Sequence, residues 1–182
     1  RRFERRVIEM KHPPSPLPAS IAEENLSLEL TTRCTNDCSH CFARAGKSRF
    51  DDLPVETAYA LLAEGYGLGY RHLHLTGGEP FLWKGIFSLI ERAFSSGYET
   101  VFINTNGSLL DKVCCGALAK FGEGLILSLS LQGPRELHEK MRGEGSFDRA
   151  CNGLYNALEA GVKTSVYTTA GRSIMPQLPR FA

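Results

Sequence analysis

The chain has 182 residues with a formal net charge of +1 at pH 7, and 42% of its residues are hydrophobic. This composition supplies one folded core, and the balanced charge gives no reason to expect nucleic acid as the main partner. No run approaches the roughly 18 apolar residues of a membrane span, and the amino terminus lacks the apolar core of a secretion signal, so a cytoplasmic location without a membrane partner is expected.

The first 25 residues differ in composition from the rest of the chain. Four of the first six residues are arginines, and prolines stand at positions 13, 14, 16 and 18. Proline at this density does not suit a helix or a central strand, so residues 1–25 are predicted to form an extended arm before a core domain of residues 26–182. Because the chain does not begin with methionine and residues 178–182 are typical of the opening of a helix, we expect a fragment.

Strand patterns and helix patterns alternate after the arm. Apolar runs rich in leucine, valine and isoleucine predict five β-strands. They cover residues 26–31, 71–76, 100–104, 125–131 and 162–169. Because successive strands begin roughly 25 to 45 residues apart, each interval has room for a helical crossover, which favours a parallel sheet.

Apolar residues at helical spacing predict a helix in each of the four intervals. The first begins near Pro54, a residue favoured in a first turn, and the second is ended by Gly97. The fourth begins with Ser146 as its cap. The inward faces of the third and fourth helices are predicted to be Leu110, Cys114, Ala117, Leu118 and Phe121, and Phe147, Cys151, Leu154 and Leu158.

The alternation of strand and helix is typical of an α/β protein, either a doubly wound parallel sheet or part of a barrel. In both architectures active sites gather beyond the carboxyl ends of the strands. Four turns of unusual composition follow predicted strands, at residues 34–41, 77–80, 105–108 and 133–134. We therefore expect these turns to lie on one face and to form a site.

Three cysteines, Cys34, Cys38 and Cys41, lie in a single segment of residues 34–41, here called the cysteine loop. A [4Fe-4S] cluster usually takes four thiolates, so three thiolates indicate a cluster with one iron left open for another ligand. A zinc site needs a second pair of ligands at short spacing, and the sequence offers no good candidate. A non-catalytic metal module, with structural zinc or an electron-transfer cluster, is the alternative interpretation.

The order of these motifs resembles that of the radical S-adenosylmethionine (radical SAM) enzymes. Cys-x3-Cys-x2-Cys follows the first strand, and Gly-Gly-Glu-Pro follows the second. The resemblance covers Leu26 to Thr169 and favours the subgroup of peptide maturases and cofactor-biosynthesis enzymes. It implies a partial (β/α)6 barrel of the TIM type, of which five strands are visible and the sixth would lie beyond this chain.

The resemblance also implies two cofactors, a [4Fe-4S] cluster on the three cysteines and S-adenosyl-L-methionine on its open iron. In the family, one electron delivered through the cluster cleaves S-adenosylmethionine to methionine and a 5′-deoxyadenosyl radical, which takes a hydrogen atom from the substrate. A peptide or a small cofactor precursor is then the expected substrate, and a flavodoxin or ferredoxin the expected one-electron donor. An activase for another enzyme is the rival within the family.

Several further residues are assigned to S-adenosylmethionine by the resemblance. The turn of Gly77, Gly78, Glu79 and Pro80 would bind the amino group through its backbone, and two glycines after a strand allow a backbone to approach a ligand closely. His40 would lie near the adenine. An ordinary strand-to-helix turn and an exposed loop histidine are the alternatives.

The strand at residues 125–131 places Ser128 and Ser130, followed by Gln132, on one face and leucines on the other. This polar row predicts an interior lined for a ligand. The run Ser130-Leu131-Gln132-Gly133 is similar to the family's Ser-Leu-Asp-Gly, in which the serine contacts S-adenosylmethionine. Gln132 stands where the family has aspartate, and an amide is given no acid or base role.

Three other segments supply candidate contacts. Arg142 lies in a run similar to a His-x3-Arg-Gly pattern of the family and would present its guanidinium to the methionine carboxylate; an exposed loop arginine is the alternative. Asn106, in the turn after the third strand, is a candidate ligand contact. Val166 and Thr168 on the fifth strand are expected near the adenine. Catalytic residues that act on the substrate are left unassigned.

Overall fold

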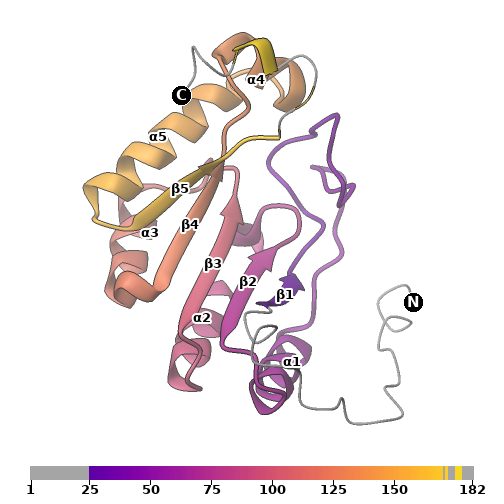
Figure 1. Ribbon diagram of the computed structural model, residues 1–182. Helices are drawn as coiled ribbons and strands as arrows, with labels where there is room; N and C mark the ends of the chain where they lie inside the picture. The colour runs from indigo at the N-terminus through magenta and orange to yellow at the C-terminus, as the bar shows by residue number, and fades with distance from the viewer. Residues whose placement is uncertain (1–24, 170, 172–174, 178–182) are drawn as a thin grey trace.

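The computed structural model describes residues 25–169, 171 and 175–177. Five strands form one sheet in the order β1-β2-β3-β4-β5, and every neighbouring pair is parallel (Figure 1). They are β1 (Asn25–Glu29), β2 (His72–Thr76), β3 (Thr100–Thr105), β4 (Leu125–Ser130) and β5 (Lys163–Tyr167). The predicted α/β class with a parallel sheet is confirmed. Residues 1–24 of the predicted arm lie outside the described residues.

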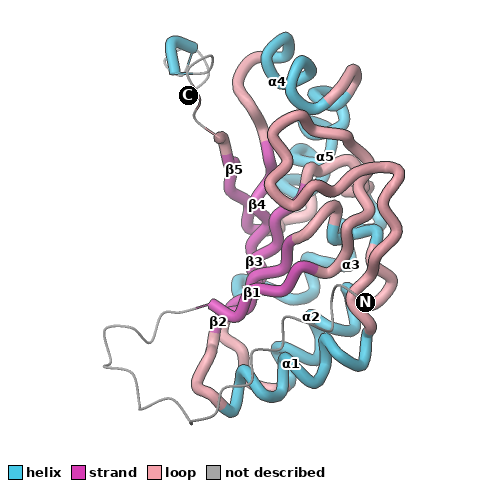
Figure 2. The backbone as a smooth tube through the Cα atoms, turned by 90° about the vertical axis from the view of Figure 1, so that its right-hand side faces the viewer, coloured by secondary structure: helices cyan, strands magenta, loops and turns pink. Residues whose placement is uncertain are grey.

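Helices connect the strands and pack on one side of the sheet. Figure 2 shows the sheet from the side, with α1, α2, α3 and α5 on the same side. The helices are α1 (Val55–Gly67), α2 (Ile86–Ser95), α3 (Lys112–Leu118), α4 (Arg135–Arg142) and α5 (Ser146–Glu159), with the short 3-10 helices η3 (Pro80–Leu82), η4 (Ala119–Gly124) and η5 (Met175–Gln177). Among the described residues, none of these helices has the length and apolar character needed to cross a membrane.

The hydrophobic core fills the space between the sheet and these helices. Successive strand residues point to opposite faces, so Leu73 and Leu75 of β2 lie on the same side as Leu125 and Leu127 of β4, and all four are fully buried. Burial of each leucine contributes on the order of 2 kcal/mol relative to exposure. This layer fixes the central strands and therefore the positions of the turns that follow them.

The opposite face of the sheet is polar toward its carboxyl end. Asn104 of β3, Ser128 of β4 and Ser165 of β5 are register partners in adjacent strands. The predicted alternation of serines and leucines along β4 is confirmed. Strand β5 has no described neighbour on its outer side, and Val166 and Tyr167 are 46% and 56% exposed.

The predicted inward face of the last helix is wrong at Leu158, whereas Leu154 packs against the core as predicted. The buried residues of α5 include Ala150, Gly153 and Ala157, whereas Leu158 is 54% exposed. The reason is a close approach: a Cβ atom at residue 153 would overlap the carbonyl oxygen of Gly107. Only small residues fit at this distance, so the large apolar residues are displaced to the flanks of the helix.

Three further differences concern the helices between the later strands. Ser146 is the first residue of α5 rather than its cap; Gly145 precedes it, and the Ser146 hydroxyl donates to the Gly143 carbonyl at 2.6 Å. In α3, Cys114 is half-buried and packs against the core as predicted, but the fully buried cysteine is its neighbour Cys115, which was not assigned to the inward face. Helix α4 was not predicted, because it has only eight residues, most of them charged, and its apolar side is limited to Leu137 and Met141.

Candidate active site

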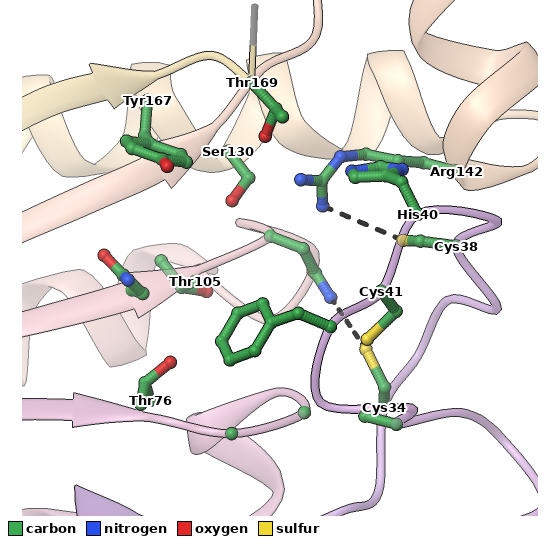
Figure 3. A pocket seen from close by; sticks show the side chains of 16 residues that line it. Cys34, Cys38, His40, Cys41, Thr76, Thr105, Ser130, Arg142, Tyr167 and Thr169 are labelled. Atoms are coloured by element: carbon green, nitrogen blue, oxygen red, sulfur yellow. Dashed lines mark hydrogen bonds between the residues drawn. The ribbon is translucent and has the colours of Figure 1, made fainter. Parts of the chain in front are cut away.

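A cavity of about 290 Å³ lies at the carboxyl edge of the sheet. Its walls come from the cysteine loop and the two residues after it, the ends of β2 and β3, strand β4, helix α4 and the end of β5, as Figure 3 shows. The lining residues are Cys34, Cys38, His40, Cys41, Phe42, Ala45, Thr76, Gly77, Gly78, Asn104, Thr105, Asn106, Ser130, Arg142, Tyr167 and Thr169. Turns far apart in sequence thus meet where the parallel topology predicts a site.

The three cysteines of the loop are free thiols that line this cavity together (Figure 3). Backbone hydrogen bonds fix the loop: the Cys34 amide donates to the Gly46 carbonyl at 3.2 Å, and the Cys41 amide donates to the Cys38 carbonyl at 3.2 Å. Burial raises the pKa of the Cys34 thiol to about 11 and also raises the pKa of Cys38. A bound metal would therefore have to displace these thiol protons.

The arrangement of ligands disfavours a single-ion site. Within the described part of the chain, no three His, Cys, Asp or Glu side chains converge closely enough to hold one metal ion. Structural zinc requires four donors around one centre. A cubane binds each cysteine to a different iron and so tolerates thiols that are spread over a cavity wall. The donor set here, three thiols on one short loop, fits a cluster with an open iron.

The glycine turn packs against residues 31–33, which lead directly into the cysteine loop. The Gly78 amide donates to the Thr31 carbonyl at 2.7 Å, and the Glu79 amide donates to the Arg33 carbonyl at 2.8 Å. Gly77 has φ of +126°, and a Cβ atom there would lie 2.6 Å from the Thr31 carbonyl oxygen. This turn therefore needs glycine because it lies close to the backbone at Thr31, and not only because a ligand would approach it.

Two residues of the same turn lie behind the cavity wall rather than on it. Glu79 is fully buried; its Oε1 accepts from the Thr105 hydroxyl at 2.8 Å, and its Oε2 accepts from the Asn106 amide at 2.9 Å. Burial raises the pKa of Glu79 to about 7. Pro80 is buried as the first residue of η3. Glu79 thus joins the turn after β2 to the turn after β3.

Asn106 lines the cavity and contacts the cysteine loop directly. Its Nδ2 donates to the Thr35 hydroxyl at 2.9 Å and to the Cys34 sulfur at 3.6 Å. Its Oδ1 accepts from the Ser108 amide at 2.9 Å. The amide side chain is therefore held at both ends.

Helix α4 brings a cation to the cavity. The Arg142 Nη1 lies 3.9 Å from the Cys38 sulfur, and its charge counteracts the effect of burial on the Cys38 pKa (Figure 3). Burial and the Arg142 charge together lower the pKa of His40. The Arg142 Nε and His40 Nδ1 are buried without a hydrogen-bond partner among the described residues. Buried polar atoms are rarely left unpaired, so these two atoms fit a cavity that binds a polar ligand.

His138 fixes helix α4 onto the end of β4. Its Nδ1 accepts from the Gln132 amide at 3.0 Å, and its ring meets Phe147 edge to face. Burial, followed by the positive charge of Arg142, lowers the His138 pKa to about 4, so this histidine is neutral at pH 7. A neutral imidazole is what the accepting role at Nδ1 requires.

The predicted polar row of β4 reaches the cavity only in part. Ser130 lines the cavity, whereas Ser128 is 2% exposed and lies deeper in the sheet. Gln132 is fully buried, and its Oε1 accepts from the Thr169 amide at 2.8 Å. Gln132 therefore connects the ends of β4 and β5 and does not face the cavity.

The sequence prediction missed several lining residues. Tyr167 and Thr169 face the cavity, whereas Val166 and Thr168 were expected to, so the prediction for β5 was shifted by one residue onto the other face. Phe42, directly after Cys41, was not singled out, although an aromatic residue beside a ligand cysteine was a usable signal. Asn104 and Thr76 were also missed as lining residues, although both lie at the carboxyl ends of strands that were predicted.

A parallel α/β sheet with a cysteine-lined cavity at its carboxyl edge defines the class as an α/β protein whose candidate site lies beyond the carboxyl ends of its strands. The chain belongs to the radical SAM superfamily, whose family model matches residues 28–176. Enzymes of this superfamily use a [4Fe-4S] cluster and S-adenosylmethionine.

Characterised relatives carry out different reactions. The chain is 34% identical over 152 residues to Fe-coproporphyrin III synthase of Methanosarcina barkeri, covering 82% of this chain and 38% of that protein. It is 30% identical over 161 residues to mycofactocin maturase MftC of Mycolicibacterium smegmatis, covering 86% and 40%. It is 32% identical over 155 residues to GTP 3′,8-cyclase 2 of Pseudomonas aeruginosa, covering 81% and 46%. The chain thus spans less than half the length of these relatives.

Solved structures show the same fold. The structure of anSMEcpe with bound AdoMet superposes with a TM-score of 0.71 at 18% identity, covering 86% of this chain and 47% of that one. Streptococcus suis SuiB bound to the precursor peptide SuiA superposes with a TM-score of 0.70 at 23% identity, covering 87% and 36%. The predicted partial barrel is confirmed by these neighbours, which are radical SAM barrels of the TIM type.

Proposed function

We propose that this chain is the core of a radical SAM enzyme that holds a [4Fe-4S] cluster on Cys34, Cys38 and Cys41 and binds S-adenosylmethionine in the adjoining cavity. The observation that carries the proposal is that all three thiols share one cavity with the glycine turn and with Arg142. When bound, these cofactors supply a one-electron cleavage that gives methionine and a 5′-deoxyadenosyl radical able to abstract hydrogen from a substrate.

The protein groups around the cavity suit the charged end of S-adenosylmethionine. Arg142 supplies a planar guanidinium for the methionine carboxylate, and its unpaired Nε supports this assignment. The amides of Gly78 and Glu79 donate to the Thr31 and Arg33 carbonyls, so the ammonium is assigned to the remaining backbone groups of Gly77 and Gly78, the two residues of the turn that line the cavity. The Glu79 side chain lies behind the cavity wall and stabilises this turn through its hydrogen bonds with Thr105 and Asn106.

Aromatic and hydroxyl side chains suit the nucleoside end. His40, Phe42 and Tyr167 line the cavity, and Phe42 is 80% exposed although it is fully apolar. An adenine ring bound against these side chains would cover that surface and exclude water from it. Ser130 and Thr169 place hydroxyl groups in the same part of the cavity and are assigned to the ribose (Figure 3).

The substrate is proposed to be a peptide or a small cofactor precursor. The relatives named as a maturase, a GTP cyclase and a porphyrin synthase span both classes, which supports this range and nothing narrower. The electron donor is proposed to be a flavodoxin or a ferredoxin, and the location to be the cytoplasm.

The direct test is anaerobic reconstitution with iron and sulfide, reduction by dithionite, and an assay for 5′-deoxyadenosine. We expect cluster absorbance and conversion of S-adenosylmethionine in the wild type. Cys34→Ser, Cys38→Ser and Cys41→Ser should each lose both signals. Cys151→Ser is the matched control, since Cys151 lies on α5 outside the cavity wall and its loss should change neither signal.

Two results would contradict the proposal. One is a full cluster retained in any of the three cavity variants, and the other is stoichiometric zinc in protein purified without oxygen.

A further inference from the structure

We propose that Asn106 is a positioning residue for the cluster, whose side-chain N–H donates to the Cys34 thiolate and raises the reduction potential of the bound [4Fe-4S] group. This inference rests on the proposed function, because it requires that Cys34 be a cluster ligand. It assigns Asn106 to the cysteine and not to S-adenosylmethionine.

The hydrogen-bond network determines which end of the Asn106 amide faces the sulfur. The Ser108 backbone N–H must meet an acceptor, so the Asn106 Oδ1 lies toward Ser108 at 2.9 Å. The Nδ2 then lies toward the cysteine loop, where its two protons reach the Thr35 hydroxyl at 2.9 Å and the Cys34 sulfur at 3.6 Å. The reverse orientation would place an N–H against an N–H and an oxygen against sulfur.

The backbone of Asn106 is held as firmly as its side chain. Its amide donates to the buried Glu79 carboxylate at 2.9 Å, and the same carboxylate accepts from the Thr105 hydroxyl at 2.8 Å. The Thr105 hydroxyl in turn accepts from the Gly107 amide at 3.0 Å. Asn106 is only 8% exposed. Its N–H is therefore directed at Cys34 before any metal binds.

The three cysteines are not equivalent in this respect. Cys34 receives a neutral amide from Asn106, and Cys38 receives the charged Arg142 at 3.9 Å. For Cys41, the described residues provide no side-chain hydrogen bond. Arg142 lies where a ligand's carboxylate would compete for its charge, whereas the Asn106 contact is independent of such a ligand.

A hydrogen bond to a cluster sulfur favours the reduced state. Reduction adds negative charge that is shared by the thiolates, and an N–H dipole aimed at one of them stabilises that charge. Loss of the Asn106 amide should therefore make the midpoint potential more negative while the cluster remains bound.

The test is a redox titration of the cluster-loaded protein without S-adenosylmethionine. The titration is monitored by the electron paramagnetic resonance signal of the reduced cluster. Asn106→Ala should shift the midpoint to a more negative potential at unchanged iron content. Asn106→Asp should shift it further, because a carboxylate adds a repelling charge. Ser108→Ala is the matched control: it removes the 2.7 Å contact between the Ser108 and Thr35 hydroxyls in the same turn but keeps the amide, and its potential should equal that of the wild type.

A second measurement is independent of the potential. Wild-type protein labelled with ¹⁵N only at asparagine side-chain amides should show a ¹⁵N hyperfine coupling in pulsed spectra of the reduced cluster; Ser108→Ala should retain it, and Asn106→Ala should lose it. Absence of that coupling, or an unchanged potential in loaded Asn106→Ala, would overturn the inference. If the wild type assembled no cluster at all, the proposed function would fail instead, so the two failures are distinguishable.

Discussion

The carbonyl oxygen of Arg33 occupies the space that a side chain at Gly78 would need. A Cβ atom at residue 78 would overlap this oxygen, and the neighbouring Glu79 amide donates to it at 2.8 Å. The turn after β2 and the loop that carries the cysteines are therefore packed backbone against backbone. Arg33 is itself anchored by a bidentate pair with Asp52, at 2.9 and 2.7 Å.

Gly78→Ala should consequently damage the cluster site more than the fold. The clash is with backbone, which cannot rotate away, so we expect a loss of about 1–3 kcal/mol in unfolding free energy and a large loss of bound iron after reconstitution. Urea unfolding and iron analysis measure the two effects. Gly116→Ala is the control, because residue 116 lies in α3 with open space around it, and alanine there should stabilise by about 0.5–1 kcal/mol. Equal iron contents in the two variants would refute this prediction.

Gly153→Ala tests the docking of α5. A Cβ atom at residue 153 would overlap the Gly107 carbonyl, so we expect destabilisation of about 1–3 kcal/mol, again measured by urea unfolding against Gly116→Ala. Because Gly107 follows Asn106, displacement of α5 should also disturb the turn that reaches Cys34. An unchanged unfolding midpoint would contradict this prediction, because it would mean that α5 can move outward without a loss of unfolding free energy.

Between pH 4 and 7 the largest opposing contributions to the pH dependence of stability come from Glu79 and His138; burial also lowers the pKa of His40 and His74, by less. Burial raises the pKa of Glu79 from 4.5 to about 7, so between these values the folded chain holds a proton that the unfolded chain has lost. This contribution is fully present below pH 4.5 and is lost as pH rises through 7, by roughly 3 kcal/mol at about 1.36 kcal/mol per pKa unit.

His138 acts in the opposite direction. Its pKa falls from 6.5 to about 4, so its contribution is present above pH 6.5 and is lost as pH decreases through 4. The two contributions largely cancel between pH 4.5 and 6.5. Glu79→Gln should therefore show unfolding free energies that rise with pH in this window, and His138→Asn should show values that fall. Urea titrations of the metal-free protein measure these slopes, and slopes of the same sign in both variants would contradict the assignment.

Arg142→Ala should change both of its neighbours. Because Arg142 lowers the pKa of His40 and of Cys38, its removal should raise both, measurable by NMR titration of the imidazole and by the pH dependence of thiol alkylation. Loss of a charged hydrogen bond of about 1.5–3 kcal/mol would weaken S-adenosylmethionine binding by roughly 10- to 100-fold. Lys140→Ala, exposed on the same helix, is the control and should leave all three quantities unchanged.

The sequence predicted those elements of the fold and site that are determined by residues close together in the chain. The strands followed from apolar runs, and the cysteine loop and glycine turn followed from their spacing after strands. Helix α4 was not predicted, since it is short and offers only Leu137 and Met141 as apolar residues at helical spacing, and His138 holds it through a contact with a backbone amide. The position of Glu79 behind the cavity wall could not be predicted from the sequence either, because its partners Thr105 and Asn106 lie at the end of another strand. Burial of Ala150 instead of Leu158 in α5 depended on how closely two segments approach.

Within the described part of the chain, the outer edge of β5 pairs with no other strand. The side chains of Val166 and Tyr167 are about half exposed on this edge strand and add apolar surface to it. An edge of this kind recruits strands from other molecules. A lysine or proline introduced on β5 would therefore reduce association through sheet extension.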